Sequence, residues 1–411
     1  MKHLLMILDH FPPAFAPRMG YLCKYLNDMG WDAVALSTPH PNRETGFEFL
    51  ENFAESYVVK EANYTESNLI KRIYNESYGI IKRRPYWSHA DEKMYKKAME
   101  LMQTHKFDAI LCSTASFFPL HCASRIAEEC NLPILIDLRD IYEQEDNLLA
   151  HSILSKHLHK RQIAKRNIIL SKANAVTTVS TWHKEHLSQF NPNTTLIFNG
   201  FDKDLFTFPQ PIETDKFTIT YTGSIREPGA NGEHTQSPEM LFQVIAELLE
   251  QGILNQNSLI IRFFSDKESQ SLVAQLASKY DLQFLVQQND WVAATEIPQI
   301  LAESNVLLLL QSESNTHGIL TTKLFEYMAS NREILCIPNS GGEIETILSD
   351  ANAGCCIDFQ PELISYIKFK YNEWQKNHFV EPHTNRTFVE NFSREREAMQ
   401  FVNILNQITK K

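Results

Sequence analysis

The stretch Gly318-Ile-Leu-Thr-Thr-Lys-Leu-Phe-Glu-Tyr-Met-Ala-Ser-Asn-Arg-Glu-Ile-Leu-Cys-Ile-Pro338 decides the fold of this chain. An apolar run, Val306 to Leu310, precedes it and predicts a buried strand. A polar loop then leads into a helix that begins near Thr322, and a second apolar run, Ile334 to Ile337, predicts the next strand. This is a strand–loop–helix–strand unit of an open α/β sheet, which binds ligands beyond the carboxyl ends of its strands.

The start of this helix has the features of an anion site. The first backbone N–H groups of a helix have no partner within it, and the helix dipole is positive there. Thr321 and Thr322 stand where capping residues belong, and Lys323 adds a cation. Glu326, one turn further on, can accept hydrogen bonds from the diol of a ribose. The pattern therefore indicates a nucleotide site, although a Thr-Thr pair before a helix is more often a simple cap.

The composition is that of an ordinary acidic globular protein. Of the 411 residues, 43% are hydrophobic and 22% are charged, and the formal net charge is −11. That length predicts two or three domains, and the negative charge argues against nucleic acid as a general partner. The seven cysteines form no Cys-x-x-Cys pair and mostly lie in apolar runs. We therefore expect reduced core cysteines, without disulfides or metal ligation.

Localisation is expected to be cytoplasmic. Residues 1–9 become polar too quickly for a signal peptide, and no run of about 18 apolar residues predicts a membrane span. Two basic segments raise the question of contact with the inner face of the membrane: residues 69–97, where cations alternate with aromatic residues, and residues 156–166, which hold five cations. Such segments can bind an anionic lipid surface, although a solvated amphipathic helix explains them more simply.

Apolar runs alternate with helical patterns along the chain, except in residues 40–105, which we interpret as irregular. This alternation predicts an α/β fold with parallel sheets covered on both faces. The pattern restarts near residues 199–215, so we predict two Rossmann-like doubly wound domains, residues 1–200 and 201–385. A C-terminal helix within residues 386–411 is expected to pack back on the first domain. Strands are expected at 4–8, 33–36, 109–112, 134–137, 175–179, 195–198, 217–221, 259–264, 283–286, 306–310, 334–337 and 355–357.

Several segments together resemble glycosyltransferases of the family-four type, in particular those of bacterial surface-polysaccharide synthesis. The resemblance covers most of the chain, and it implies two Rossmann-like domains that face a cleft, the GT-B architecture. The segments that carry it are Phe11-Pro12-Pro13, Asp137-Leu-Arg-Asp140, Ala173-Asn-Ala-Val-Thr-Thr-Val-Ser180, Phe198-Asn199-Gly200-Phe201-Asp202, Tyr221-Thr-Gly223-Ser224 and Lys323-Leu-Phe-Glu326-Tyr-Met-Ala followed by Gly341-Gly342.

The resemblance implies a donor site in the second domain. There Glu326 holds the ribose, and Arg226 and Lys323 lie across the leaving diphosphate. The other residues placed at the nucleotide are Gly223, Ser224, Trp291, Val292, Thr321 and Thr322. Many members carry a second Glu where this chain has Gly318, and the usual Lys shortly after Arg226 is missing. Arg226 fits an ordinary loop cation equally well, and Trp291 fits a core residue.

The resemblance also implies an acceptor side in the first domain. Asp140 is our candidate for activating the acceptor hydroxyl, with Asp137 and Arg139 as competitors and a structural Arg–Asp pair as the alternative. Ala16, Arg18 and Asn199 are expected on the diphosphate side of this domain, where the opening loop lacks the glycine pair of many members. Arg18 opens a helix and so needs an anionic partner, which is either the donor or a nearby carboxylate.

The expected activity is transfer of a sugar from a UDP- or GDP-sugar to a hydroxyl of a glycan, a lipid-linked glycan or a small molecule. We expect a retaining, hexosyltransferase-like enzyme without a metal or other cofactor, since no Asp-x-Asp motif is evident. The alternatives are a nucleotide-sugar epimerase of similar fold and an inactive nucleotide-sugar-binding or scaffold protein. A dehydrogenase is disfavoured, because no Gly-x-Gly-x-x-Gly follows the first expected strand.

Overall fold

The computed structural model describes residues 1–14, 17–39, 46–60, 62, 77–78, 87–145, 153–226, 236–311, 318–338 and 341–410. The chain forms two compact units: residues 1–199 together with 394–411, and residues 200–393. The C-terminal segment that belongs with the first unit therefore starts at residue 394 and not at residue 386. The reason is that α13 (Arg386–Val389) and the turn after it belong to the second unit, where α13 packs on α10 and α11.

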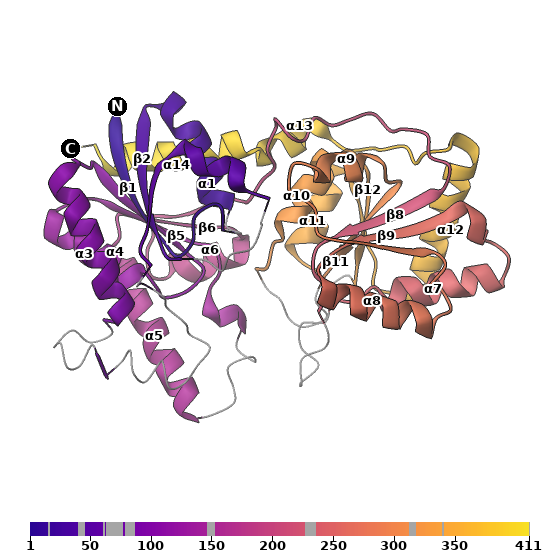
Figure 1. Ribbon diagram of the computed structural model, residues 1–411, viewed down its shortest axis with the longest axis horizontal. Helices are drawn as coiled ribbons and strands as arrows, with labels where there is room; N and C mark the ends of the chain where they lie inside the picture. The colour runs from indigo at the N-terminus through magenta and orange to yellow at the C-terminus, as the bar shows by residue number, and fades with distance from the viewer. Residues whose placement is uncertain are drawn as a thin grey trace. The chain divides into compact units, whose positions relative to one another are not determined.

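The first unit is built on a parallel sheet with strand order β3-β2-β1-β4-β5-β6-β7 (Figure 1). The chain begins in the middle, winds outward to β3, returns to the other side of β1 with β4 and then continues to β7. This is the order of a doubly wound Rossmann-like sheet. The strands are β1 (Lys2–Leu8), β2 (Trp31–Ser37), β3 (Glu55–Val58), β4 (Ala109–Thr114), β5 (Ile134–Leu138), β6 (Ala175–Thr178) and β7 (Thr194–Leu196).

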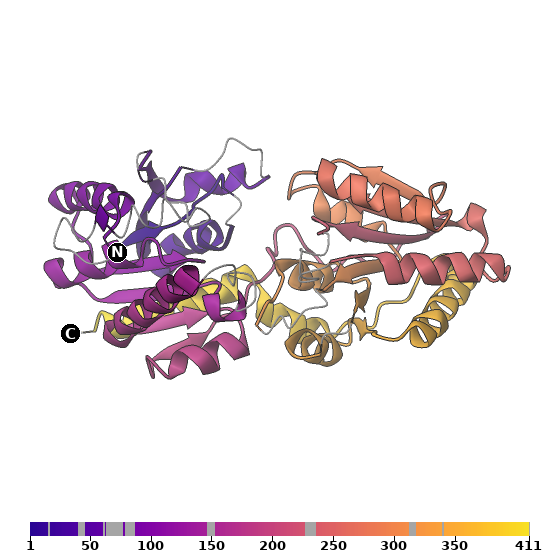
Figure 2. The ribbon, with the colours of Figure 1, turned by 90° about the horizontal axis from the view of Figure 1, so that it is seen from below.

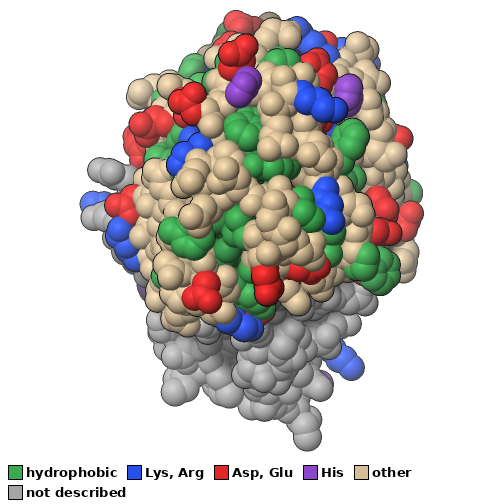
Figure 3. Space-filling model, turned by 90° about the vertical axis from the view of Figure 1, so that its right-hand side faces the viewer, with side chains coloured by type: hydrophobic (Ala, Val, Ile, Leu, Met, Phe, Trp, Pro, Cys, Tyr) green, Lys and Arg blue, Asp and Glu red, His purple; other side chains and the backbone are tan. Residues whose placement is uncertain are grey.

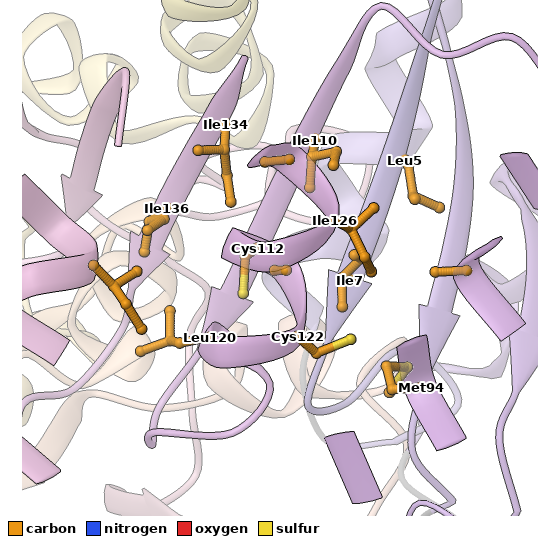
Figure 4. Close-up of a cluster of buried hydrophobic side chains, with 14 of the residues drawn as sticks. Leu5, Ile7, Met94, Ile110, Cys112, Leu120, Cys122, Ile126, Ile134 and Ile136 are labelled. Carbon is orange, nitrogen blue, oxygen red and sulfur yellow. The ribbon is translucent and has the colours of Figure 1, made fainter. Parts of the chain in front are cut away.

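Helices cover both faces of this sheet, because successive strand residues point to opposite sides and both sets are apolar. One set, which includes Leu5 and Ile7, packs against α3 and α4 (Figure 4). The other set, which includes Leu4 and Met6, packs against α1 and α14. The helical elements are α1 (Pro17–Leu26), η1 (Asn27–Met29), η2 (Glu48–Phe53), α3 (His89–Thr104), α4 (Leu120–Cys130), η3 (Tyr142–Glu145), α5 (Ile153–Lys172), α6 (Thr181–Ser188) and α14 (Arg394–Ile408).

Within residues 40–105 the interpretation as irregular is wrong for the described part, which contains β3 and α3. A signal for α3 was present: Ser88 and Asp91 form a capping box, in which each side chain accepts from the other's backbone N–H. The interpretation of residues 156–166 as an amphipathic helix is correct for the helix, which is α5 (Ile153–Lys172), but not for the amphipathic pattern. Its apolar residues form no single stripe, because the helix buries His159, Lys165 and Arg166 among them.

A buried charge network joins α14 to the rest of the first unit. The Arg18 guanidinium is only 3% exposed and donates to both oxygens of Asp137, each at 3.2 Å, and to Glu397 of α14 at 2.5 Å. It also donates to the Ile197 carbonyl at 2.9 Å and lies over the Phe401 ring. Burial opposes the charge, but the two carboxylates outweigh it and raise the pKa of Arg18. The C-terminal helix is therefore held by ionic contacts as well as by apolar packing.

The second unit repeats the design with strand order β10-β9-β8-β11-β12-β13, again all parallel. Figure 2 shows helices on both sides of this sheet. The strands are β8 (Phe217–Thr222), β9 (Leu259–Phe264), β10 (Val286–Asn289), β11 (Val306–Leu310), β12 (Glu333–Ile337) and β13 (Gly354–Cys356). The helical elements are α7 (Glu239–Glu250), η4 (Gln256–Ser258), α8 (Lys267–Lys279), α9 (Ile297–Ala302), α10 (Thr322–Ala329), α11 (Glu343–Ala351), α12 (Gln360–Asn377), α13 and η5 (Glu390–Phe392).

Two elements of this unit differ from the prediction. The strand expected at 283–286 lies at 286–289. Leu282 and Leu285 are buried in the turn before it, while the edge strand itself carries exposed glutamines. The helix α12 was not predicted, although Leu363, Ile367 and Tyr371 recur at helical spacing and are buried against the sheet.

None of the helices in the described part of the chain combines the length and apolar character needed to cross a bilayer. On the face of the second unit seen in Figure 3, hydrophobic side chains are dispersed among charged and polar ones.

We expect the substitution Arg18→Met to lower the free energy of unfolding of the first unit by about 3–5 kcal/mol, because it leaves the buried Asp137 without a counter-ion and leaves Glu397 paired with Arg394 alone. Lys24→Met, which changes a partly exposed cation on the same helix, is the control and should change stability by less than about 1 kcal/mol. Differential scanning calorimetry measures both. Equal effects of the two substitutions would show that the network does not stabilise the unit.

Candidate functional site

The strand order of the second unit places its switch point between β8 and β11. From β8 the chain winds through β9 to β10 on one side, and from β11 through β12 to β13 on the other. In open α/β sheets ligands bind outside the carboxyl ends of the strands at this point, where the flanking loops diverge. The residues that follow β8 and those at the start of α10, which follows β11, are therefore the candidate ligand-binding groups.

Lys323 is the cation at this switch point. Its ammonium donates to the Tyr221 hydroxyl at 3.1 Å and lies 4.6 Å from the centre of the Tyr221 ring. Tyr221 in turn donates to the Ser224 carbonyl at 2.7 Å. The lysine side chain thus crosses from α10 to the end of β8, the strand in the middle of the sheet.

Gly223 makes room for this ammonium. A Cβ at residue 223 would lie 2.1 Å from Nζ of Lys323 and 2.5 Å from its Cε. The backbone φ of Gly223 is +126°, a conformation that residues with a side chain rarely adopt. The backbone conformation therefore favours glycine at residue 223, and an added Cβ would also displace the end of the Lys323 side chain. The sequence did not predict the close approach of Gly223 and Lys323.

The charge of Lys323 is sensitive to its surroundings. Burial lowers the pKa of Lys323 and the nearby Arg226 lowers it further, while Tyr327 and Glu326 act in the opposite direction, and the net shift is downward. A second anion beside the ammonium would favour the protonated form.

The start of α10 differs from the expected cap. Thr321 occupies the N-cap position with an extended backbone, but its side chain makes no capping hydrogen bond. The expectation that Thr321 caps through its hydroxyl is therefore wrong, and this hydroxyl does not compete with a ligand for the first-turn amides. Thr322 is the first residue of the helix and is partly exposed, as is Glu326.

The helix α10 is held in place by Tyr327. Its buried hydroxyl accepts from the Thr222 backbone N–H at 3.0 Å and lies 3.0 Å from the Thr222 hydroxyl. Burial is the main cause that raises the pKa of Tyr327 to about 12, so it remains a neutral phenol. This contact fixes α10 against the last residue of β8 and thereby sets the position of Lys323, one turn earlier on the same helix.

The loop after β8 is anchored to α8. Ser224 donates to Asp266 at 2.6 Å, and Asp266 caps α8 by accepting from the Ser269 N–H at 2.9 Å. Burial opposes ionisation of Asp266, but the hydrogen bonds from Ser224 and Ser269 outweigh it and lower its pKa. Ser224 is therefore engaged with a carboxylate, and sequence reasoning did not predict this link.

The other predicted donor residues lie on separate loops of the second unit. Arg226 is exposed and forms an isolated bridge with Gln236. Trp291 and Val292 follow β10 and are both partly exposed, so Trp291 is not a core residue. Their loops leave the carboxyl ends of β8 and β10, which belong to the same edge of the sheet because all its strands are parallel.

In the first unit the three candidates at the end of β5 have different surroundings. Asp137 is fully buried and accepts from Ser113 and Thr177, each at 2.8 Å, as well as from Arg18. Arg139 pairs with Asp9, and Asp140 is exposed. The alternative of a structural Arg–Asp pair thus applies to Arg139, but with a partner that the sequence did not suggest.

The predicted diphosphate side of the first unit is only partly described. Of the two partners considered for Arg18, the structure supplies the carboxylates, those of Asp137 and Glu397. Asn199 accepts from Arg18 at 3.3 Å. Ala16 lies outside the described residues.

The two basic segments contain few exposed, unneutralised cations in the described parts. Residues 69–76 and 79–86 lie outside the described part, as does the side chain of Lys156. On α3, Lys96 and Lys97 pair with Glu92 and Glu100. On α5 the cations divide: Lys160 and Arg161 are exposed, whereas Lys165 and Arg166 are buried, with Arg166 on Glu143. Two of these four cations are therefore not exposed on the surface of α5.

No family model matches the chain, and the search of curated proteins likewise gives no match. Solved structures do match over nearly the whole chain. They include sucrose-phosphate synthase from Thermosynechococcus elongatus, with a TM-score of 0.68, 14% identity and 99% of each chain covered. They also include HepE of Anabaena in complex with UDP and glucose, with a TM-score of 0.65, 15% identity, and 99% of this chain and 100% of that chain covered.

A glycosyltransferase from Rickettsia africae matches with a TM-score of 0.64 and 14% identity, covering 100% of this chain and 99% of that chain. At these identities the likeness shows the fold. It confirms the predicted α/β class with two Rossmann-like domains, the GT-B fold. Among the described residues, no group of three or more His, Cys, Asp or Glu is arranged to hold a metal ion.

We expect Gly223→Ala to weaken the binding of UDP by about tenfold or more, since the new methyl group displaces the Lys323 ammonium. Gly252→Ala is a matched control, because Gly252 also has a positive φ, +66°, but an added Cβ there meets nothing within 4 Å. Both substitutions should cost about 1–2 kcal/mol of stability through backbone strain. Isothermal titration calorimetry distinguishes them, and equal UDP affinities would contradict the assignment of Lys323 to the nucleotide.

The affinity for UDP should fall with rising pH already below the usual lysine pKa of about 10.4, because burial lowers the pKa of Lys323 and removes its charge earlier. The prediction assigns diphosphate binding to the protonated form of Lys323, so affinity should be full below this pKa and should be lost above it. Lys323→Arg keeps a charge over the whole range, and its pH profile should be flatter. Identical profiles for the two proteins would rule out titration of Lys323 as the cause.

Proposed function

We propose that this protein is a glycosyltransferase that moves a sugar from a nucleotide-sugar donor to a hydroxyl group of a glycan, free or lipid-linked. The observation that carries the proposal is the placement of Lys323 at the switch point of the second sheet, over a glycine that a side chain would block. The GT-B fold shared with glycosyltransferases of known structure supports the same interpretation. One protein of this fold, HepE of Anabaena, was solved in complex with UDP and glucose.

The donor diphosphate is proposed to lie against the first-turn amides of α10 and the Lys323 ammonium. Negative charge grows on the leaving diphosphate as its bond to the anomeric carbon stretches, and fixed donors aimed at that charge stabilise the transition state. Arg226, exposed on the loop after Gly223, is the proposed second cation. Because these groups supply positive charge themselves, we propose that transfer needs no metal ion.

Glu326 is proposed to bind the ribose. It follows Lys323 by one helical turn and is partly exposed on α10, so it lies on the same face of the helix as the cation. A carboxylate can accept from both hydroxyls of a 2′,3′-diol. Trp291 and Val292, partly exposed beyond β10, are proposed to contact the base of a UDP- or GDP-sugar.

Asp140 is the proposed acceptor-side group. It is the exposed carboxylate of the segment after β5, whereas Asp137 is buried and engaged with three neighbours. It would orient the acceptor hydroxyl or take its proton. We propose retention of anomeric configuration, with the leaving phosphate able to take the proton itself, and a role in polysaccharide synthesis.

The assay that tests the whole proposal is incubation with UDP- and GDP-sugars, with separate measurement of released nucleotide and of altered sugar. Slow hydrolysis or transfer releases UDP or GDP, whereas an epimerase interconverts nucleotide sugars without lasting release. A scaffold protein binds the nucleotide and does neither. Thermal shift reports binding independently, since a ligand at about 100 times its dissociation constant stabilises by about 2.7 kcal/mol.

The ribose assignment predicts a specific loss in Glu326→Gln. The wild-type protein should bind UDP about tenfold more tightly than 2′-deoxy-UDP, because a hydrogen bond to a carboxylate contributes about 1.5–3 kcal/mol. In Glu326→Gln the affinity for UDP should fall and the preference over 2′-deoxy-UDP should shrink to about threefold or less. Glu268→Gln, at the start of α8, is the control, because Glu268 lies in the first turn of another helix. Unchanged discrimination in Glu326→Gln would disprove the ribose contact.

A further inference from the structure

The first sheet has its own switch point, between β1 and β4, and an unpredicted ion pair lies there. Asp9 directly follows β1, Thr114 ends β4, and Arg139 follows β5, which pairs with β4. Arg139 donates through Nη2 to the Asp9 carboxylate, at 2.6 Å from Oδ1. Its backbone N–H donates to the Thr114 carbonyl at 3.1 Å. The pair therefore spans the carboxyl ends of three strands.

The Asp9 carboxylate is fully engaged. Oδ1 accepts from the His10 N–H at 2.7 Å and from Arg139, and Oδ2 accepts from the Ala115 N–H at 3.0 Å and from Arg139. With both oxygens occupied, Asp9 is not placed to act as a base. Its effect is to hold the guanidinium of Arg139 and to balance its charge.

Several N–H donors of the Arg139 guanidinium have no hydrogen-bond partner among the described residues. Within the described residues its side chain bonds only to Asp9, and only through Nη2. Its Nε is shielded from solvent and has no partner there, while the side chain as a whole is 18% exposed. A guanidinium has five N–H donors in a fixed planar fork, so the donors of Nη1 remain for a ligand at the mouth of the sheet.

The neighbouring residues suit a sugar. Asp140 is exposed next to Arg139. Two residues further, the partly exposed Tyr142 stacks on Phe117 from the loop after β4, with ring centres 4.3 Å apart and planes 7° apart. Its ring also lies edge-on to His159 of α5, with ring centres 4.8 Å apart. A spare guanidinium edge, a carboxylate and an aromatic ring follow β5 within four residues. This is the mixture of a few placed polar groups and an aromatic surface that small-molecule sites use.

The charge balance favours an uncharged ligand. Asp9 neutralises the guanidinium, and Asp140 adds a negative charge, so a phosphate or carboxylate would meet no net positive charge from these three groups. Hydroxyl groups need donors and acceptors but no charge, and both are present.

We propose that Arg139, held by Asp9, is a binding residue for the uncharged hydroxyl-bearing sugar of the acceptor, with Tyr142 and Asp140 as its neighbours in the same subsite. This inference rests on the proposed function. It adds that the acceptor is recognised through sugar hydroxyls rather than through a phosphate group.

The test is saturation-transfer difference NMR with methyl α-D-glucopyranoside, methyl α-D-galactopyranoside and the methyl glycoside of N-acetylglucosamine, each with saturating UDP. Arg139→Lys keeps the cation beside Asp9 but loses the guanidinium fork, so it should fold normally and bind UDP as the wild type does. Its affinity for the glycoside that the wild type binds should fall by about tenfold or more. Arg125→Met removes a partly exposed Arg–Glu129 pair on α4 of the same unit and should leave glycoside binding unchanged.

Each outcome decides the proposal. Glycoside binding that survives in Arg139→Lys overturns it, as does a wild-type protein that binds none of the three glycosides. Displacement of a bound glycoside by millimolar inorganic phosphate overturns the choice of an uncharged ligand. Failure of the proposed function looks different, because then neither UDP nor GDP raises the melting temperature of the wild-type protein.

Discussion

The absence of a side chain at residue 223 is the constraint on which the candidate donor site depends. The Lys323 ammonium occupies the space beside Gly223 that a Cβ would fill, and it rests on the Tyr221 hydroxyl and ring. Tyr327 fixes the helix that carries the lysine to Thr222. A cation is thus held at the carboxyl end of the central strand, where an open α/β sheet receives its ligand.

In the first unit two arginines differ in how many of their N–H donors have partners. Arg18 is fully occupied by Asp137, Glu397 and the Ile197 carbonyl, and it joins the C-terminal helix to the sheet. Arg139 is occupied on one edge only. The two arginines therefore have different roles. The buried Arg18 holds the unit together, and the partly exposed Arg139 retains donors for a ligand. Burial and hydrogen-bond count separate these roles, whereas residue type does not.

Much of the fold could be predicted because its main signal is local. Strands such as Leu307 to Leu310 are buried on both faces, so they appear in the sequence as continuous apolar runs. The helix α5 is not the solvated amphipathic helix expected at residues 156–166, because it buries Lys165 and Arg166. The strand β10 was predicted three residues too early, because the buried Leu282 and Leu285 lie before it rather than in it. In each case tertiary packing overrode the pattern of hydrophobic residues.

The sequence by itself determined the doubly wound α/β class and the spacing of Lys323 and Glu326 on one helix, because both follow from periodicity over a few residues. Only the tertiary structure decided which groups meet. Tyr221 and Lys323 are 102 residues apart, and Asp9 and Arg139 are 130 apart. These pairs form because the strand order brings distant strand ends to one edge of a sheet. That order depends on the packing of whole sheets, so no local pattern encodes it.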